Sequence, residues 1–420
     1  MSFEDVYSAI CAFVANTGIF IKGDQKLQRM QDLMNCLGNP QNKLKVVHVA
    51  GTSGKTSTSY FVAAFLQRAG QGVGLTISPH VVDVRERAQI NLAILEEDVY
   101  VREVAEYLDL VKAGKQHPSY MEFFMGFFYY LAAKMQLDYV VVETGLGGLY
   151  DASNVVRRRD KVCLITDIGH DHTEILGDTL TEIAWQKAGI IGADNPVFMH
   201  EQSPEVMRSI LDVADAQNAP VQIVPEKDFA GLPGFQAHNA GLALAAVEFV
   251  LGRDGEEPLT PTQIAEAAKV AIPARAEEFV YKGKRVVIDG AHNPQKLAVF
   301  GEHIMKKYGD KKIVLVAAFG SNKVASLDGN LECLSQMTKS IVLTTFEDSS
   351  VETAFRQSLA PEIVKTSAKK HGFSDIKIVK DPKKALQEAA KTNGEVVVVT
   401  GSFLLLNHIR PVLLGGLDVR

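Results

Sequence analysis

KVVHVAGTSGKTS, residues 45–57, combines an apolar run, a loop with two glycines, and a lysine followed by two hydroxyl side chains. The apolar run 45–50 is typical of a buried β-strand, and residues 57–69 carry apolar side chains at helical spacing. A strand that enters a glycine-bearing loop and leaves it as a helix is the order found in phosphate-binding loops. The stretch therefore predicts α/β structure and a site for a nucleotide.

The loop residues suit an anion for separate physical reasons. Gly51 and Gly54 allow backbone N–H groups to turn inward toward phosphate oxygens. The start of the following helix presents further free N–H groups, and Lys55 adds a positive charge. A hydroxyl from the Thr56-Ser57 pair can hold magnesium. Val49 stands where the full eight-residue P-loop pattern has its first glycine, so the motif is the shorter G-x-x-G-K-T.

Further β-rich runs recur along the chain, and each ends in a glycine-bearing or polar loop: 139–143, 162–167, 285–289, 313–317, 341–345 and 395–400. Helix-like segments, among them 182–190 and 239–251, lie between them. Strands that alternate with helices predict α/β architecture with mostly parallel sheets. Because a chain of 420 residues is too long for one average core, we expect two domains, residues 1–272 and residues 273–420.

The composition is that of an ordinary globular enzyme, with 46% hydrophobic and 22% charged residues. A formal net charge of -6 gives no general attraction for nucleic acid or an anionic membrane. None of the four cysteines has C-x-x-C or metal-like spacing, which favours reduced thiols in a reducing compartment. The first residues lack the basic region of a signal peptide, and the most apolar stretch, near 123–133, is too short to span a bilayer. We therefore expect a cytoplasmic protein.

Acidic and histidine side chains gather where predicted strands end: Glu143; Asp167, His170, Asp171 and His172; Asp289 and His292. The carboxyl ends of parallel strands are where α/β sheets bind ligands. Carboxylate oxygens beside a phosphate loop are suited to magnesium, a hard cation. Zinc is the alternative for the histidine-rich group, although no cysteine lies near it. A further polar strand end, Thr400-Gly401-Ser402, lies in the second predicted domain.

Taken together, these motifs resemble the folylpolyglutamate synthase/dihydrofolate synthase family of the Mur ligase superfamily. The matching motifs keep their order through nearly the whole chain: LGNPQ (37–41), HVAGTSGKTS (48–57), SPH (78–80), ERAQIN (86–91), ETGLGGLYDASN (143–154), DHTEILGDT (171–179), QKAGII (186–191), DGAHNP (289–294) and TGS (400–402). The resemblance implies a P-loop-containing, ATP-binding N-terminal domain of the Mur ligase type. It also implies a smaller, Rossmann-like α/β C-terminal domain that binds glutamate.

The resemblance also implies roles for residues that match the family's motifs. The phosphates of ATP would be bound by the loop residues Gly51, Thr52, Ser53, Gly54, Lys55, Thr56 and Ser57. The magnesium ligands would be Ser78, Glu143 and His172. Lys187 matches the lysine that the family carbamylates, which would give a second magnesium site. Nucleotide contacts would come from Asn239, Arg275 and Asp289, and contacts to the incoming glutamate from Arg87, His292 and Ser402.

The implied reaction is an ATP- and magnesium-dependent amide ligation in two steps. A substrate carboxylate attacks the γ-phosphate of ATP, and the amine of L-glutamate then attacks the resulting acyl phosphate. The acceptor carboxylate would belong to dihydropteroate, to reduced folates, or to both, and one sequence does not choose among them. The resemblance further implies a monomer that acts on small molecules.

Three departures from the family's pattern bear on the acceptor. The family's loop reads T-N-G-K-G-S, whereas this chain has Ser53 and Thr56, and Ala274 stands where the family has a glycine. One alternative is a Mur-type ligase that acts on another carboxylate. Such enzymes carry a full substrate domain before the loop, whereas in this sequence the loop begins at Gly51, which leaves too few residues for an ordinary domain. The other alternative is a non-catalytic nucleotide-binding scaffold. Against it, the ionic groups that the reaction needs are all present, and ADP release that depends on glutamate and folate separates the two.

Overall fold

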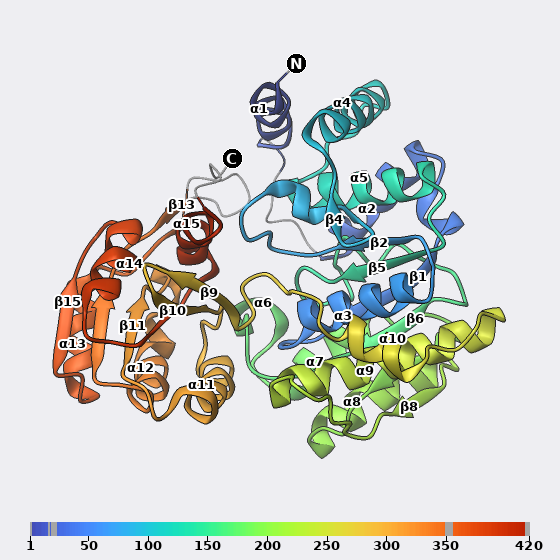
Figure 1. Cartoon of the computed structure of the whole chain (residues 1–420). Helices are drawn as coiled ribbons and strands as arrows, with labels where there is room; N and C mark the ends of the chain where they lie inside the picture. The colour runs from blue at the N-terminus through green and yellow to red at the C-terminus, as the bar shows by residue number, and fades with distance from the viewer. Residues whose placement is uncertain (1, 16, 18–22, 349–355, 416–420) are drawn as a thin grey trace. The chain divides into compact units, whose positions relative to one another are not determined.

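The apolar runs of the sequence form the central strands of two separate sheets in the computed structural model, which describes residues 2–15, 17, 23–348 and 356–415 (Figure 1). The chain divides into two units, one of Met1–His80 with Val84–Val270 and the other of Val81–Asp83 with Ala271–Arg420. Each unit has helices around a mostly parallel sheet, which confirms the predicted α/β architecture. Among the described residues, no helix has both the length and the hydropathy to cross a membrane.

The sheet of the first unit has the strand order β4-β3-β2-β5-β1-β6-β7-β8. Its strands are β1 (Lys45–Ala50), β2 (Val73–Thr76), β3 (Gln89–Ile90), β4 (Ala93–Ile94), β5 (Tyr139–Glu143), β6 (Val162–Ile165), β7 (Val197–Met199) and β8 (Val221–Ile223). The pairs from β2 through β8 are parallel, and the short strands β3 and β4 are antiparallel at one edge. Because β1 and β5 are apolar without alternation, both of their faces are buried under helices.

The helices of the first unit are α1 (Phe3–Val14), α2 (Gly23–Cys36), α3 (Lys55–Arg68), α4 (Glu97–Ala113), α5 (Tyr120–Lys134), α6 (Thr173–Leu176), α7 (Leu180–Ala188), α8 (Pro204–Ala216), α9 (Gly234–Asp254) and α10 (Pro261–Ala267), with 3-10 turns at Pro40–Lys43 and Val84–Arg87. Helix α3 follows the glycine loop, packs against β2 and β5, and lies beside α9, which packs against β6 and β7. This position buries nearly every side chain of α3, which fixes the loop before it.

The second unit has a sheet of order β15-β12-β11-β16-β10-β9. Its elements are β9 (Glu277–Tyr281), β10 (Lys284–Ile288), α11 (Pro294–Tyr308), β11 (Ile313–Ala317), a 3-10 turn (Ser321–Ser326), α12 (Leu327–Ser335), β12 (Ser340–Leu343), the short β13 (Glu347–Asp348) and β14 (Arg356–Gln357), α13 (Pro361–Lys370), β15 (Asp375–Ile378), α14 (Pro382–Lys391), β16 (Val396–Thr400) and α15 (Phe403–Leu413). Only β9 runs antiparallel to its neighbour within this sheet. Val81 packs into the core of this unit, although the chain on both sides of Val81–Asp83 belongs to the first unit.

Several predicted bounds differ from those in the structure. The strand predicted at 162–167 ends at Ile165, because the main chain of Thr166 and Asp167 turns to bond Ala50 and the glycine loop. The helix predicted at 239–251 is longer and runs from Gly234 to Asp254. Its end is set by Gly255, which has the left-handed conformation typical of a helix terminus.

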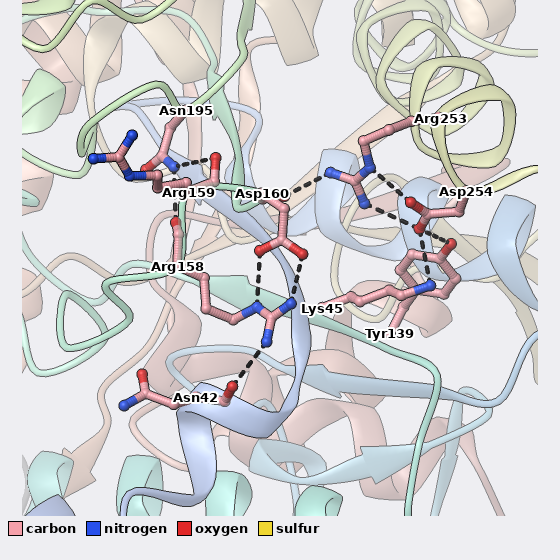
Figure 2. A network of polar contacts seen from close by, with 9 residues as sticks. All are labelled: Asn42, Lys45, Tyr139, Arg158, Arg159, Asp160, Asn195, Arg253 and Asp254. Atoms are coloured by element: carbon pink, nitrogen blue, oxygen red, sulfur yellow. Dashed lines mark hydrogen bonds and ion pairs between the residues drawn. The ribbon is translucent and has the colours of Figure 1, made fainter.

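A polar network ties the starts of the strands to the far end of α9 (Figure 2). Asp254 accepts hydrogen bonds from Tyr139 Oη at 2.5 Å and Arg253 Nε at 2.7 Å, and its carboxylate lies 3.1 Å from Lys45 Nζ. Arg253 also donates to the main-chain oxygen of Asp160 at 2.6 Å. The network thus secures the C-terminal end of α9 at the amino-terminal ends of β1 and β5, whereas the glycine loop follows the carboxyl end of β1.

Candidate active site

The glycine loop is held by the segment that follows β6. Thr52 and Ser53 donate their backbone N–H groups to the main-chain oxygen of Asp167, at 2.8 and 3.2 Å. The Thr52 hydroxyl donates to the oxygen of Gly169 at 3.0 Å. Gly54 has φ +88, and a side chain there would collide with Asn239 on α9. A residue without a Cβ is therefore required where the loop meets α9.

Two lysines from distant parts of the sequence reach the same point of this loop. Lys55 Nζ donates to the main-chain oxygen of Gly51 at 3.0 Å, and Lys187 Nζ donates to the same oxygen at 2.8 Å. Lys187 is buried on α7, which brings a cation beneath the loop. Two positive charges beside the N-terminus of α3, where backbone N–H groups have no partner within the helix, provide an anion-attracting site.

Thr56 and Ser78 both contact the Glu143 carboxylate at the end of β5. The Thr56 hydroxyl donates to Glu143 Oε1 at 2.9 Å, and the backbone N–H of Ser78 lies 3.3 Å from Glu143 Oε2, to which it donates. The Ser78 hydroxyl is buried and has no hydrogen-bond partner within the described part of the chain. A buried hydroxyl without a partner beside a carboxylate fits a hard cation such as magnesium.

His172 and Arg87 occupy different surroundings. His172 has a left-handed backbone at the start of α6, and its ring nitrogens lie 3.9 Å from Asp171 Oδ1 and 3.7 Å from Glu174 Oε1. Its place in a magnesium site stays a prediction. Arg87 is buried, donates from Nε to His80 Nδ1 at 3.0 Å, and lies over the ring of Tyr120. Arg87 is thus held by His80 and Tyr120.

In the second unit, Asp289 organises the loop between β10 and α11. Its carboxylate accepts the backbone N–H groups of Ala276 and Ala291, both at 2.8 Å. Burial raises the pKa of Asp289, and the nearby charge of Arg275 opposes that rise. The Asp289 carboxylate therefore fixes the loop that carries His292, and it also lies close to Arg275.

Phe403 connects the remaining predicted residues of the second unit. The Arg275 guanidinium lies 4.4 Å from the centroid of the Phe403 ring, and the His292 ring lies edge-on to it at 6.0 Å. His292 Nδ1 donates to the oxygen of Gly290 at 2.8 Å, a tautomer assigned from this contact, which leaves Nε2 as an acceptor. The Ser402 hydroxyl caps α15 by accepting the N–H of Leu404 at 3.1 Å.

The structure thus brings Lys55 and Lys187 together at Gly51 and places Thr56 against Glu143, and it adds residues that the sequence did not single out. Lys161 is fully buried and donates to the main-chain oxygen of Ile190 at 2.7 Å, just after Lys187. Burial lowers the pKa of Lys161. A lysine beside an apolar strand usually indicates an exposed charge, so its pattern gave no signal. Phe403 likewise has the pattern of an ordinary apolar helix residue.

Comparison with known proteins adds an independent line of evidence. Residues 49–216 match the model of the Mur ligase middle domain, and residues 274–403 match that of the Mur ligase, glutamate ligase domain. The chain is 30% identical to a dihydrofolate synthase/folylpolyglutamate synthase of Bacillus subtilis, over 91% of this chain and 94% of that protein.

Two solved structures extend this similarity to the fold. A folylpolyglutamate synthase of Mycobacterium tuberculosis complexed with ADP has a TM-score of 0.85 and 26% identity, over 100% of this chain and 99% of that one. A bifunctional folylpolyglutamate synthase/dihydrofolate synthase of Yersinia pestis, complexed with AMPPNP and Mn ion, has a TM-score of 0.79 and 25% identity, over 97% and 98%.

Proposed function

The chain belongs to the folylpolyglutamate synthase/dihydrofolate synthase family of Mur ligases, and on that basis we propose that it joins L-glutamate to a folate-type carboxylate with the conversion of ATP to ADP. It is an ATP-dependent ligase that forms an amide bond and works with a divalent metal ion. The observation that carries the proposal is the convergence of Lys55 and Lys187 on Gly51, next to the Thr56–Glu143 pair.

The first step would transfer the γ-phosphoryl group of ATP to the acceptor carboxylate. A carboxylate does not form an amide with an amine directly in water, and the acyl phosphate supplies a leaving group. Phosphoryl transfer needs positioning and charge neutralisation more than covalent help from the protein. The loop N–H groups would hold the phosphates, and the ammonium of Lys55 would balance the charge that develops on the oxygens.

Magnesium would be held by the oxygen atoms of Thr56, Ser78 and Glu143, with His172 as a further ligand. Bound there, the ion would neutralise phosphate charge and orient the phosphoryl group. Lys187 would form a second site if carbon dioxide adds to its amine, because a carbamate replaces an ammonium with oxygen ligands. Both the second site and the carbamate are parts of the proposal.

Residues of both units have roles in the proposal. Asn239 of the first unit, and Arg275 and Asp289 of the second, would contact the nucleotide. In the second step, Arg87 of the first unit, and His292 and Ser402 of the second, would orient the incoming glutamate. The amine of glutamate attacks the acyl carbon, the C–N bond forms, and inorganic phosphate leaves with the electrons of the C–O bond. We further propose that the enzyme is a cytoplasmic monomer.

The decisive assay follows ADP release from MgATP and L-glutamate with dihydropteroate in one reaction and tetrahydrofolate in another. Release in either reaction, lost in Lys55→Ala, is the expected result, and the active reaction identifies the acceptor. A protein that binds ATP but releases no ADP in either reaction contradicts the folate assignment. The leading interpretations would then be a Mur-type ligase for another carboxylate, or a non-catalytic scaffold.

A further inference from the structure

A pair of stacked histidines lies beside the segment that supports the glycine loop, and the proposed reaction uses neither ring. His200 follows β7, and His238 lies in the second turn of α9. Their ring centroids are 3.8 Å apart with an interplanar angle of 28°. His200 is buried, and its Nε2 lies 2.9 Å from the main-chain oxygen of His238. The pair therefore fixes the start of α9 against the end of the sheet.

His238 is placed between two carboxylates. Its Nε2 lies 3.0 Å from Asp167 Oδ1, and its Nδ1 lies 2.7 Å from Glu226 Oε1. Ionised carboxylates only accept hydrogen bonds, so both contacts are hydrogen bonds only when the ring carries both protons. Burial disfavours that charge, but the hydrogen bonds and charges of Asp167 and then Glu226 outweigh it and raise the pKa of His238.

His238 is connected to the glycine loop in two ways, through Asp167 and through the adjacent residue Asn239. On one side, Asp167 uses its main-chain oxygen to accept the N–H groups of Thr52 and Ser53. On the other side, the next residue of α9, Asn239, accepts a hydrogen bond from the Thr58 hydroxyl at 3.3 Å and fills the space beside Gly54. One ring thus connects the segment that holds the loop to the helix that packs against it.

We propose that Glu226, His238 and Asp167 form a positioning triad that sets the glycine loop against α9, so that a nucleotide binds tightly only when the triad is intact. The triad touches no reacting atom and acts through the loop. The proposal rests on the proposed function in one respect, that the loop is the nucleotide site. It requires neither folate nor glutamate for its test.

A metal site is the alternative interpretation for a cluster that overlaps the triad. His200, Glu226 and His238 offer ligand atoms within 4.8 Å of one another. A metal lies in the plane of each imidazole that binds it, however, and two stacked rings do not direct their nitrogens to a common point. Both nitrogens of His238 already face carboxylates. The geometry therefore favours a charged, hydrogen-bonded ring over a metal ligand.

The first test measures the affinity of the full-length protein for MgADP by calorimetry, without folate or glutamate. We expect His238→Ala to weaken binding about tenfold, the size of a typical coupling between sites. The steady-state KM for MgATP should rise by a similar factor, with kcat changed less. His238→Gln should recover part of the affinity, because its amide can still donate to one carboxylate. His371→Ala is the matched control, since His371 forms a comparable pair with Asp328 at 3.2 Å in the second unit.

The pH dependence provides a readout that a purely structural role would not change. The titratable groups that face His238 are Asp167 after β6, His200 after β7 and Glu226 after β8. As the pH increases through the pKa of His238, the ring loses its charge and one of its two hydrogen bonds to the carboxylates. The wild-type KM for MgATP should therefore rise over that pH range, and this rise should be absent in His238→Gln. Asp167→Asn removes one carboxylate charge but keeps the main-chain oxygen, so it should shift the rise to lower pH.

The possible results separate the hypotheses. A wild-type protein that does not bind MgADP contradicts the proposed function itself. Wild-type affinity retained in a folded His238→Ala overturns the triad. Should His238→Ala not fold, a dependence of KM on pH that stays at the wild-type position in both Asp167→Asn and His238→Gln overturns it instead. Stoichiometric zinc in the purified wild type that is lost in His238→Ala also overturns it, because the cluster would then be a metal site.

Discussion

Lys187 Nζ donates to the main-chain oxygen of Gly51 at 2.8 Å, across 136 positions of sequence. Helix α7 thus delivers a buried amine to the glycine loop, where Lys55 already contacts the same oxygen. No pattern in QKAGII predicts this position, because a lysine on a helix is ordinarily a solvated charge. The contact places Lys187 at the proposed phosphate site and gives it a testable role.

Replacing Lys187 with alanine should lower kcat about a hundredfold or more, the usual cost of losing a group that stabilises charge in the transition state. If the amine is carbamylated, protein incubated with 13C-bicarbonate should show a carbamate carbon signal by NMR, and Lys187→Ala should lose it. In that case, small carboxylates added to Lys187→Ala should restore part of its activity, because they replace the oxygen ligands of the carbamate. Trp185→Phe is the control, because Trp185 lies on the same helix with 47% of its surface exposed. Unchanged kcat in Lys187→Ala would contradict the role.

Glu143→Gln should raise the magnesium concentration needed for half-maximal activity by about tenfold or more. The carboxylate is buried and accepts from the Thr56 hydroxyl, so the amide keeps the shape of the site but removes its charge. Ser78→Ala should act in the same direction, since its buried hydroxyl lacks a partner in the described structure. Glu248→Gln, at an exposed position of α9, serves as the control. An unchanged magnesium requirement in both variants would exclude this location for the ion.

Local pattern was sufficient to predict the central strands and the residues that follow them. The apolar runs at β1, β5 and β11 have the predicted bounds, because a strand buried on both faces is apolar without interruption. Glu143 was expected at a strand end and lies there. The edge strands β3 and β4 were not predicted, since two-residue strands carry no periodicity.

Contacts between distant segments could not be predicted in this way. His238 next to Asp167, and Phe403 under Arg275, depend on how helices pack on the sheets. Neither residue type is unusual at its own position, so no local pattern singles it out. Long-range polar contacts are decided by tertiary structure, and the family resemblance supplied roles only where a motif matched.

The Asp254 network predicts a stability change with pH (Figure 2). The hydrogen bond from Arg253, with those from Tyr139 and Lys45, outweighs partial burial and holds the pKa of Asp254 below its ordinary value. A depressed folded-state pKa contributes stability above the unfolded pKa of about 3.9, and that stability is lost as the pH falls through the folded value. Asp254→Asn should therefore lower the free energy of unfolding by about 2 kcal/mol at pH 7, with a smaller difference from wild type below pH 4 or so.

Urea unfolding of both proteins at neutral and acidic pH checks this prediction. Each unit can unfold in its own transition, so the transition that belongs to the first unit is the one compared. Asp212→Asn, at an exposed position of α8, is the control and should match wild type at both pH values. An equal difference between Asp254→Asn and wild type at every pH would show that the carboxylate charge is not the source of the stability.

The contact between Gly290 and Phe403 allows the loop that carries His292 to be displaced on purpose. A methyl group at Gly290 would collide with the Phe403 ring, so Gly290→Ala must move either the ring or the loop. Because Asp289 and His292 flank this glycine, we expect a loss of about a hundredfold in kcat/KM for glutamate, as small misplacements near a reacting centre commonly cost. Gly301→Ala on α11 is the matched control, since a methyl group there meets Met337 only at ordinary contact distance.

Phe403→Ala alone removes the ring beneath Arg275 and should mainly raise KM for ATP. The double variant Gly290→Ala/Phe403→Ala should recover part of the activity with glutamate that Gly290→Ala loses. If the losses of the two single variants add in the double variant, the Phe403 ring is not what displaces the loop in Gly290→Ala. The Asp289 hydrogen bonds alone would then hold the loop in place.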